Sequence, residues 1–220
     1  MEGSSKLLYV TVEEYLGNEE ISRIKHEYVD GRLFAKSGTT RRHNTIAGNV
    51  FSALRSHVLK SACQAYIADI KVQVESANCF YYPDVMVACD GLDSRSVFTK
   101  APVLIVEVLS KSTASIDRRE KVSAYRQIPC LQEYLIVHQL KRRIELHQKI
   151  ASGQWQVLEL MDGTIELLDS TPPGAMKLSL VEIYEGVDFA HHSVKEEAAI
   201  YANEVDLEFS SCNDEEALDW

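Results

Sequence analysis

The sequence feature that most constrains the fold is an apolar run with one carboxylate near its end. It spans residues 103–109, Val-Leu-Ile-Val-Glu-Val-Leu, and its acid is Glu107. A run this short and this rich in β-branched side chains predicts a strand buried on both faces, as at the centre of a parallel or mixed sheet. Burying an unpaired carboxylate is costly, so the chain must bring a cation, a metal ion or hydrogen-bond donors to Glu107.

A second carboxylate lies in the nearest upstream strand candidate. Residues 81–87, Tyr-Tyr-Pro-Asp-Val-Met-Val, place Asp84 directly after Pro83, which belongs at a strand start, an edge or a bulge because it lacks an N–H. Two carboxylates on neighbouring strands predict a site for a hard metal ion. The alternatives are a turn-forming Pro-Asp dipeptide for Asp84 and a buried salt bridge from Glu107 to Arg118 or Lys121.

The surrounding chain alternates between helix and strand patterns. Thr11 and Glu14 have the spacing of a capping box at a helix start, and Asp30-Gly31 predicts a hairpin turn. Four-residue apolar spacing over 45–59 predicts an amphipathic helix, and an alternating pattern predicts a half-exposed strand over 69–74. We also expect helices over 116–127, capped by Ser115, and over 178–184, with strands over 133–137, 143–147, 155–160 and 164–168.

These elements predict a single α/β domain: a mixed central sheet flanked by helices, with additional strands toward the C-terminus. Strand, helix and strand between residues 103 and 137 have the length of a right-handed crossover unit. We expect the domain to span 9–190, between a disordered N-terminus (1–8) and a poorly ordered acidic tail (191–220). Seven acidic residues and no basic one lie between Glu204 and Trp220. The net charge of -10 is therefore concentrated in the tail, which leaves room for a basic cleft elsewhere.

The cysteines and the hydropathy indicate the cellular environment. There are five cysteines, an odd number, and no CxxC pair. This predicts free thiols in a reducing cytoplasm and argues against both a disulfide framework and a zinc–thiolate site. No apolar run reaches the ~18 residues of a membrane span, so we expect a cytoplasmic protein without membrane association.

An ordered series of motifs between roughly Thr11 and Gly186 resembles the Uma-two family of restriction-endonuclease-like proteins, in the PD-(D/E)XK nuclease superfamily. The resemblance implies a restriction-endonuclease-like fold, a Mg²⁺-dependent DNA-cleaving site in which Mn²⁺ can substitute, and a homodimer, without an organic cofactor. The motifs are Tyr28-Val29-Asp30-Gly31, His43, Pro83-Asp84-Val85, Glu107-Val108-Leu109-Ser110, Ser112-Thr113, Asp117, Lys121, Tyr125 and Glu133-Tyr134.

One position departs from the superfamily pattern. Leu109 occupies the place where the pattern has lysine. Phosphodiester hydrolysis still requires charge stabilisation at the phosphate, and Lys121 on the next helix is the candidate to supply it. The alternative for Lys121 is a surface ion pair with Asp117, and Lys71 and Lys111 are weaker substitutes.

The predicted roles follow from the residues and the resemblance together. Asp84 and Glu107 are expected to hold the metal, with Lys121 as the catalytic cation. Glu27 matches a family acid that completes the cluster, although it also suits a solvated strand entry. Substrate contacts are expected from His43, Arg41, Arg42 and Arg118, whose alternatives are structural or solvated roles.

The sequence thus predicts a metal-dependent DNA endonuclease that hydrolyses phosphodiester bonds. A catalytically inactive nuclease-fold protein with a binding or regulatory role is the alternative, because of Leu109 and the overall acidity. A hydrolase of small phosphoesters is a third, weaker interpretation. No zinc finger, basic helix or helix-turn-helix signature indicates sequence readout.

Overall fold

The computed structural model describes residues 9–36, 38–91, 95–110, 116–168 and 173–189. The expected N-terminal segment and the acidic tail, together with Ser115 and Lys111, lie outside these ranges. None of the described helices is both long enough and apolar enough to cross a membrane.

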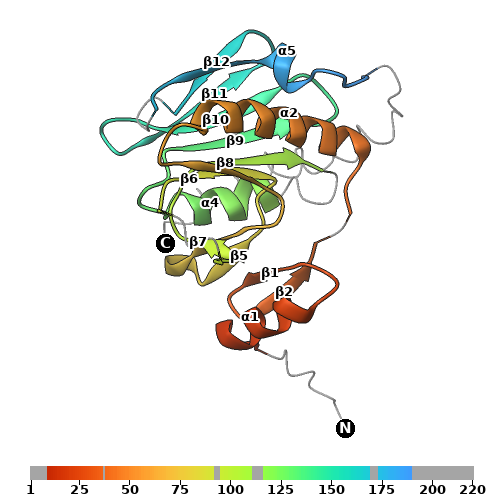
Figure 1. Ribbon diagram of the computed structural model, residues 1–220, viewed down its shortest axis with the longest axis vertical. Coiled ribbons are helices and arrows are strands. Elements are labelled where there is room, and N and C mark those ends of the chain that lie inside the picture. The colour runs from red at the N-terminus through yellow and green to blue at the C-terminus, as the bar shows by residue number, and fades with distance from the viewer. Residues whose placement is uncertain (1–8, 37, 92–94, 111–115, 169–172, 190–220) are drawn as a thin grey trace, which may run out of the picture.

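A six-stranded mixed sheet forms the centre of the molecule, and β8 is its predicted buried strand (Figure 1). β8 runs parallel to β9 and antiparallel to β6, and all its residues except Val103 are buried. This confirms the sequence expectation for the apolar run. In spatial order the strands are β11 (Trp155–Leu160), β10 (Ile144–Lys149), β9 (Glu133–His138), β8 (Pro102–Leu109), β6 (Val85–Ala88) and β3 (Gln64–Ile67).

Both faces of this sheet are covered, which explains the uninterrupted hydrophobicity of β8. Val106 and Val108 contribute to one core, under α2 (Arg41–Val58), α5 (Leu180–Ile183) and the small sheet of β12 (Thr164–Leu167) and β13 (Met176–Ser179). Ile105 and Leu109 contribute to the other core. That core also contains residues of α4 (Val122–Tyr125), β4 (Lys71–Val74) and β5 (Cys79–Tyr81). By strand alternation, Glu107 faces this second core.

A second sheet has the order β2-β1-β5-β4-β7. The predicted Asp30-Gly31 turn joins β1 (His26–Val29) to β2 (Arg32–Ala35), and both turn residues have positive φ. The predicted capping box of Thr11 and Glu14 begins α1 (Val12–Ile21), whose Tyr15 packs on β1 and β5. The remaining elements are η1 (Glu75–Ala77), β7 (Phe98–Thr99) and the π-helical segment η2 (Asp117–Lys121), which continues into α4.

Several expected boundaries were wrong. The strand expected over 81–87 is two strands in different sheets, because the chain crosses between sheets at Pro83 and Asp84. The long amphipathic helix begins at Arg41 rather than residue 45, since the Thr40 side chain caps it. The helix expected over 116–127 covers 117–125 in the structure.

Two further expectations need correction. The strand predicted over 69–74 is not half-exposed at Lys71, which is buried because β4 lies between β5 and β7. The helix predicted over 178–184 starts only at Leu180, and Met176–Ser179 forms β13 instead. The cross-strand partner of β13 is β12, and the pairing buries alternate residues of both strands.

A disulfide joins Cys63 and Cys89, contrary to the expectation of free thiols. Gln64 pairs with Ala88 across β3 and β6, so the two cysteines lie opposite one another just beyond that pair. They are 26 residues apart in the sequence, and only the strand pairing brings them together. The cysteine argument for a reducing compartment therefore does not hold, while Cys79 and Cys130 are free thiols.

Candidate active site

Asp84 and Glu107 lie side by side where β6 meets β8. Val85 pairs with Val106, and one further step along this antiparallel register places Asp84 beside Glu107 on the same face of the sheet. Asp84 is 7% exposed and Glu107 is 2% exposed. Both side chains line a cleft of about 720 Å³. The two acids that the sequence analysis selected are therefore neighbours at the floor of a cavity.

Lys121 supplies the cation that Glu107 needs. Its Nζ lies 3.0 Å from Glu107 Oε1, 3.0 Å from Glu27 Oε1 and 3.1 Å from Asp117 Oδ1. The hydroxyl of Tyr125 donates to Glu107 Oε1 over 3.1 Å. Asp117, Lys121 and Tyr125 follow one another at four-residue intervals, and the helix after β8 carries them back over that strand.

Burial and neighbouring opposite charges shift the pKa values of this cluster in opposite directions. Burial alone would lower the pKa of Lys121, but the carboxylates of Glu107, Asp117 and Glu27 raise it well above its usual value, so the lysine is charged. Burial raises the pKa of Glu107 to about 8, against the opposing charge of Lys121 and with the support of Asp117 and Asp84. Three carboxylates around one ammonium leave an excess of negative charge, which Glu107 relieves by holding a proton near neutral pH.

Asp84 is held in the ionised form. The backbone N–H of Val108 donates to Asp84 Oδ2 over 2.8 Å, and His43 Nε2 lies 3.1 Å from the same oxygen. Because the carboxylate only accepts, Nε2 of His43 carries the proton. Burial alone would raise the pKa of Asp84, but the hydrogen bond from His43 and the charge of Lys36 bring it to about 2. Lys36 Nζ lies 3.5 Å from Oδ1.

The donor set suits a small hard cation. Mg²⁺ is commonly held by one or two carboxylates, with water and substrate phosphate completing its shell. Asp84 and Glu107 provide that pair, and the contacts that the described residues make with Glu107 all use Oε1. Within the described ranges, no group of three or more histidine, cysteine, aspartate or glutamate side chains is arranged to hold a metal ion. An ion here depends on the two carboxylates and on the substrate.

The other predicted residues are divided between the cleft and its surroundings. Glu27 and His43 line the cleft. Arg41 is exposed at the start of α2, Arg42 lies over the Phe189 ring, and Arg118 pairs with Glu145, so none of these three arginines lines it. Among the described residues of the cleft lining, the arginine and lysine side chains besides Lys121 are those of Arg23, Lys25 and Lys36.

Two contributors to the site escaped the sequence analysis. Lys36 follows β2 and donates to the backbone carbonyl of Tyr82 over 2.6 Å, which places its ammonium beside Asp84. Gln139 donates to the carbonyl of Leu109 over 2.8 Å and accepts from Thr40 Oγ1 over 2.7 Å, and so connects the start of α2 to the end of β8. Neither residue belongs to a periodic pattern, so no sequence signal identified them.

Lys71, one of the substitute lysines, lies elsewhere. Its Nζ contacts the Tyr82 hydroxyl at 3.3 Å, and it is not among the residues that line the cleft. Leu109 is 1% exposed and packs in the core between β8 and α4. The cation at Glu107 therefore comes from the helix and not from β8 itself.

A comparison with family models identifies one family. The model of the family Uma2, described as "putative restriction endonuclease", matches residues 12–180. Two relatives from Synechocystis sp. (strain ATCC 27184 / PCC 6803 / Kazusa) are similar along most of their length. Uncharacterized protein slr1290 is 38% identical over 147 residues, which cover 66% of this chain and 77% of that protein. Uncharacterized protein sll1609 is 33% identical over 161 residues, covering 72% and 91%.

A solved structure shows the same fold. It is the crystal structure described as a putative nuclease belonging to DUF820 from Anabaena variabilis ATCC 29413. It superimposes with a TM-score of 0.64 at 14% sequence identity, and the match covers 80% of this chain and 97% of that one. At this identity the likeness concerns the fold, which confirms the restriction-endonuclease-like α/β architecture expected from the sequence.

Proposed function

Because this chain belongs to the Uma2 family of "putative restriction endonucleases", we propose that it is a metal-dependent DNA endonuclease that hydrolyses phosphodiester bonds. One observation carries the proposal: Asp84, directly before β6, and Glu107, on the adjacent strand β8, lie side by side in the lining of one cleft, and the ammonium of Lys121 is 3.0 Å from Glu107. A purely structural domain gains little from burying two carboxylates and a lysine together.

In this proposal, Asp84 and Glu107 hold Mg²⁺, for which Mn²⁺ can substitute. Bound metal would acidify an attacking water and polarise the phosphate. Lys121 would balance the charge of Glu107 once a bound metal ion displaces the proton of that carboxyl, and its position in the cleft lining lets it stabilise negative charge at the scissile phosphate. His43 orients Asp84 through the hydrogen bond to Oδ2 and is a positioning residue.

The same site defines the expected substrate and assembly. Arg23, Lys25 and Lys36 at the cleft lining would contact the DNA backbone, a role that the sequence analysis gave to Arg41, Arg42 and Arg118. A homodimer, as the resemblance implies, would bring two such centres to one DNA molecule. Light scattering on the purified protein measures that assembly directly.

The test is incubation of supercoiled and single-stranded DNA with the protein in Mg²⁺, in Mn²⁺ and in EDTA. We expect cleavage that requires metal and is lost in Asp84→Asn and Glu107→Gln, with both variants folded by circular dichroism. Glu166→Gln, a substitution at an exposed carboxylate on β12, is the matched control and should cleave normally. Absence of cleavage in every metal condition would refute the nuclease proposal and favour an inactive nuclease-fold binding protein, for which Leu109 is the argument.

A further inference from the structure

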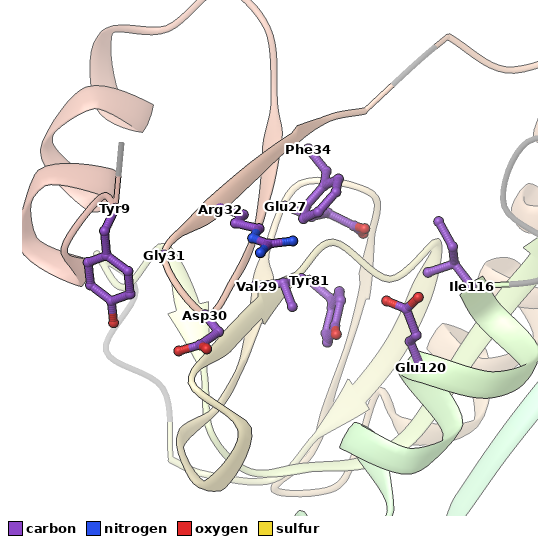
Figure 2. A pocket seen from close by; sticks show the side chains of 10 residues that line it. All are labelled: Tyr9, Glu27, Val29, Asp30, Gly31, Arg32, Phe34, Tyr81, Ile116 and Glu120. Atoms are coloured by element: carbon purple, nitrogen blue, oxygen red, sulfur yellow. The ribbon is translucent and has the colours of Figure 1, made fainter. Parts of the chain in front are cut away.

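A second hollow adjoins the cleft. It measures about 550 Å³, within the range of about 300 to 1,000 Å³ typical of ligand pockets, and lies between the β1–β2 hairpin and η2 (Figure 2). Glu27, Phe34 and Ile116 line both hollows, so they form a shared wall. A ligand bound at Glu107 can therefore extend past this wall into the second hollow.

The shared wall presents an aromatic ring to a ligand. Phe34 is 49% exposed, on a strand whose four residues are all exposed, and Ile116 is 36% exposed. Among the described residues, no other ring packs against Phe34. An exposed phenyl face at the edge of a cavity is an effective surface for stacking a planar ring.

Two polar groups enter the same hollow from opposite sides. Figure 2 shows Arg32 reaching in from the hairpin and Glu120 from η2. Both residues are exposed, and within the described part of the chain neither side chain has an ion-pair or hydrogen-bond partner. A guanidinium donor and a carboxylate acceptor are the groups with which proteins read the edges of nucleobases.

The two hollows differ in the charge of the residues that line them. Among the described residues that line the second hollow, Arg32 is the one basic residue, against the acidic Glu27, Asp30 and Glu120. The cleft, by contrast, gathers Arg23, Lys25, Lys36 and Lys121 beside its acids. A phosphate is therefore repelled from the second hollow, whereas a neutral ring with donors and acceptors on its edge suits it.

We propose that the second hollow binds one unpaired nucleobase next to the phosphate in the cleft, with the base stacked on Phe34 and its edge hydrogen-bonded to Arg32 and Glu120. The inference rests on the nuclease function proposed above and names its substrate class. A base in a duplex is paired on its edge and stacked on both faces, so the substrate is DNA that is single-stranded or carries an unpaired base.

Fluorescence anisotropy in EDTA, where a metal-dependent nuclease cannot cleave, tests the base hollow. Three labelled ligands are compared: a short single strand, the matching duplex, and a strand with the same number of phosphates made only of abasic sites. We expect the wild type to bind the single strand more tightly than the other two. Phe34→Ala should weaken single-strand binding about 5- to 150-fold and leave binding of the abasic strand unchanged.

Matched variants separate base recognition from general electrostatics. Arg32→Ala and Glu120→Gln should each weaken binding of the single strand more than binding of the abasic strand. Arg55→Ala, which removes an exposed guanidinium from α2, and Val157→Ala, which trims an exposed side chain on β11, should leave the ratio of the two affinities unchanged. Circular dichroism checks that each variant is folded.

Equal binding of intact and abasic strands by the wild type would overturn the proposal, as would undetectable DNA binding or an unchanged affinity ratio in Phe34→Ala. The cleavage assay keeps the two proposals distinguishable. If Phe34→Ala still cleaves DNA and its ratio of single-strand to abasic-strand affinity is unchanged, the proposal of a base-binding hollow is refuted and the nuclease proposal is not. If binding depends on the bases and on Phe34 but no metal ion gives cleavage, the nuclease activity is refuted and the proposal that the hollow binds a base is supported.

Discussion

Lys121 connects three parts of the chain through one buried ammonium. Its partners are Glu27 on β1, Glu107 on β8 and Asp117 in η2, and the lysine side chain is only 3% exposed. A charge this buried is tolerated only with such partners, because desolvation in the interior costs several kcal/mol per ion. Lys121, the proposed catalytic cation, therefore also stabilises the fold.

Removal of this cation should destabilise the fold. Lys121→Met leaves three carboxylates without their partner, so we expect the free energy of unfolding to fall by about 3–5 kcal/mol. Urea unfolding measures the change. Lys177→Met, which breaks the exposed pair with Glu166, is the control and should cost at most about 1 kcal/mol. Equal effects of the two substitutions would contradict the buried charge cluster.

For individual residues, the sequence predicted the position of those site residues that lie on regular strands or helices. The position of Glu107 in an apolar strand, and the four-residue spacing of Asp117, Lys121 and Tyr125, were enough to bring them together. Lys36 reaches Asp84 from a segment after the hairpin, 48 residues away in the sequence. No periodicity encodes such a contact.

The β1–β2 hairpin is the element that joins the two hollows, and its turn depends on glycine. Gly31 has φ of +82°, and a Cβ there would overlap the ring of Tyr9. We expect Gly31→Ala to lower stability by about 1–3 kcal/mol in thermal or urea unfolding. Gly17→Ala, in α1 with open space around it, should instead stabilise by about 0.5–1 kcal/mol. A neutral Gly31→Ala would show that the hairpin turn is formed differently.

The Cys63–Cys89 disulfide fastens the edge strand β3 to β6, the strand that follows Asp84. Because the cysteines are 26 residues apart in the sequence, we expect loss of the disulfide to cost about 3 kcal/mol, since the unfolded chain gains conformational freedom. Unfolding of the Cys63→Ala/Cys89→Ala variant measures this cost. In the wild type, reductant should lower stability by a similar amount, and in the variant it should have no effect. A wild type that is insensitive to reductant would show that the bond does not form.

At the scale of elements, local patterns predicted most strands and helices but not how they pair. The disulfide between Cys63 and Cys89 could not be predicted from the sequence, because the contact of the two cysteines depends on the register of β3 with β6. Leu178 and Ser179 were predicted as the start of a helix because they run directly into α5, yet pairing with β12 places them in the strand Met176–Ser179. Tertiary pairing overrides local propensity in both cases.

Across the whole molecule, charge is unevenly distributed. The chain carries a net charge of -10, yet its cleft lining includes Arg23, Lys25 and Lys36. DNA binding should therefore weaken as salt rises, and Arg23→Ala should reduce the slope of log affinity against log salt by about 0.7–0.9. Arg55→Ala, away from the cleft lining, should leave the slope unchanged. An unchanged slope in both variants would place DNA on another face.

The central claim is that Asp84 and Glu107 together hold a divalent metal ion, and titration with Mn²⁺ in a calorimeter tests it most directly. We predict saturable uptake by the wild type, weakened at least about 10-fold in both Asp84→Asn and Glu107→Gln. Glu75→Gln, at an exposed carboxylate, should bind as the wild type does. Absence of uptake by the folded wild type, or equal uptake by all four proteins, would contradict the claim.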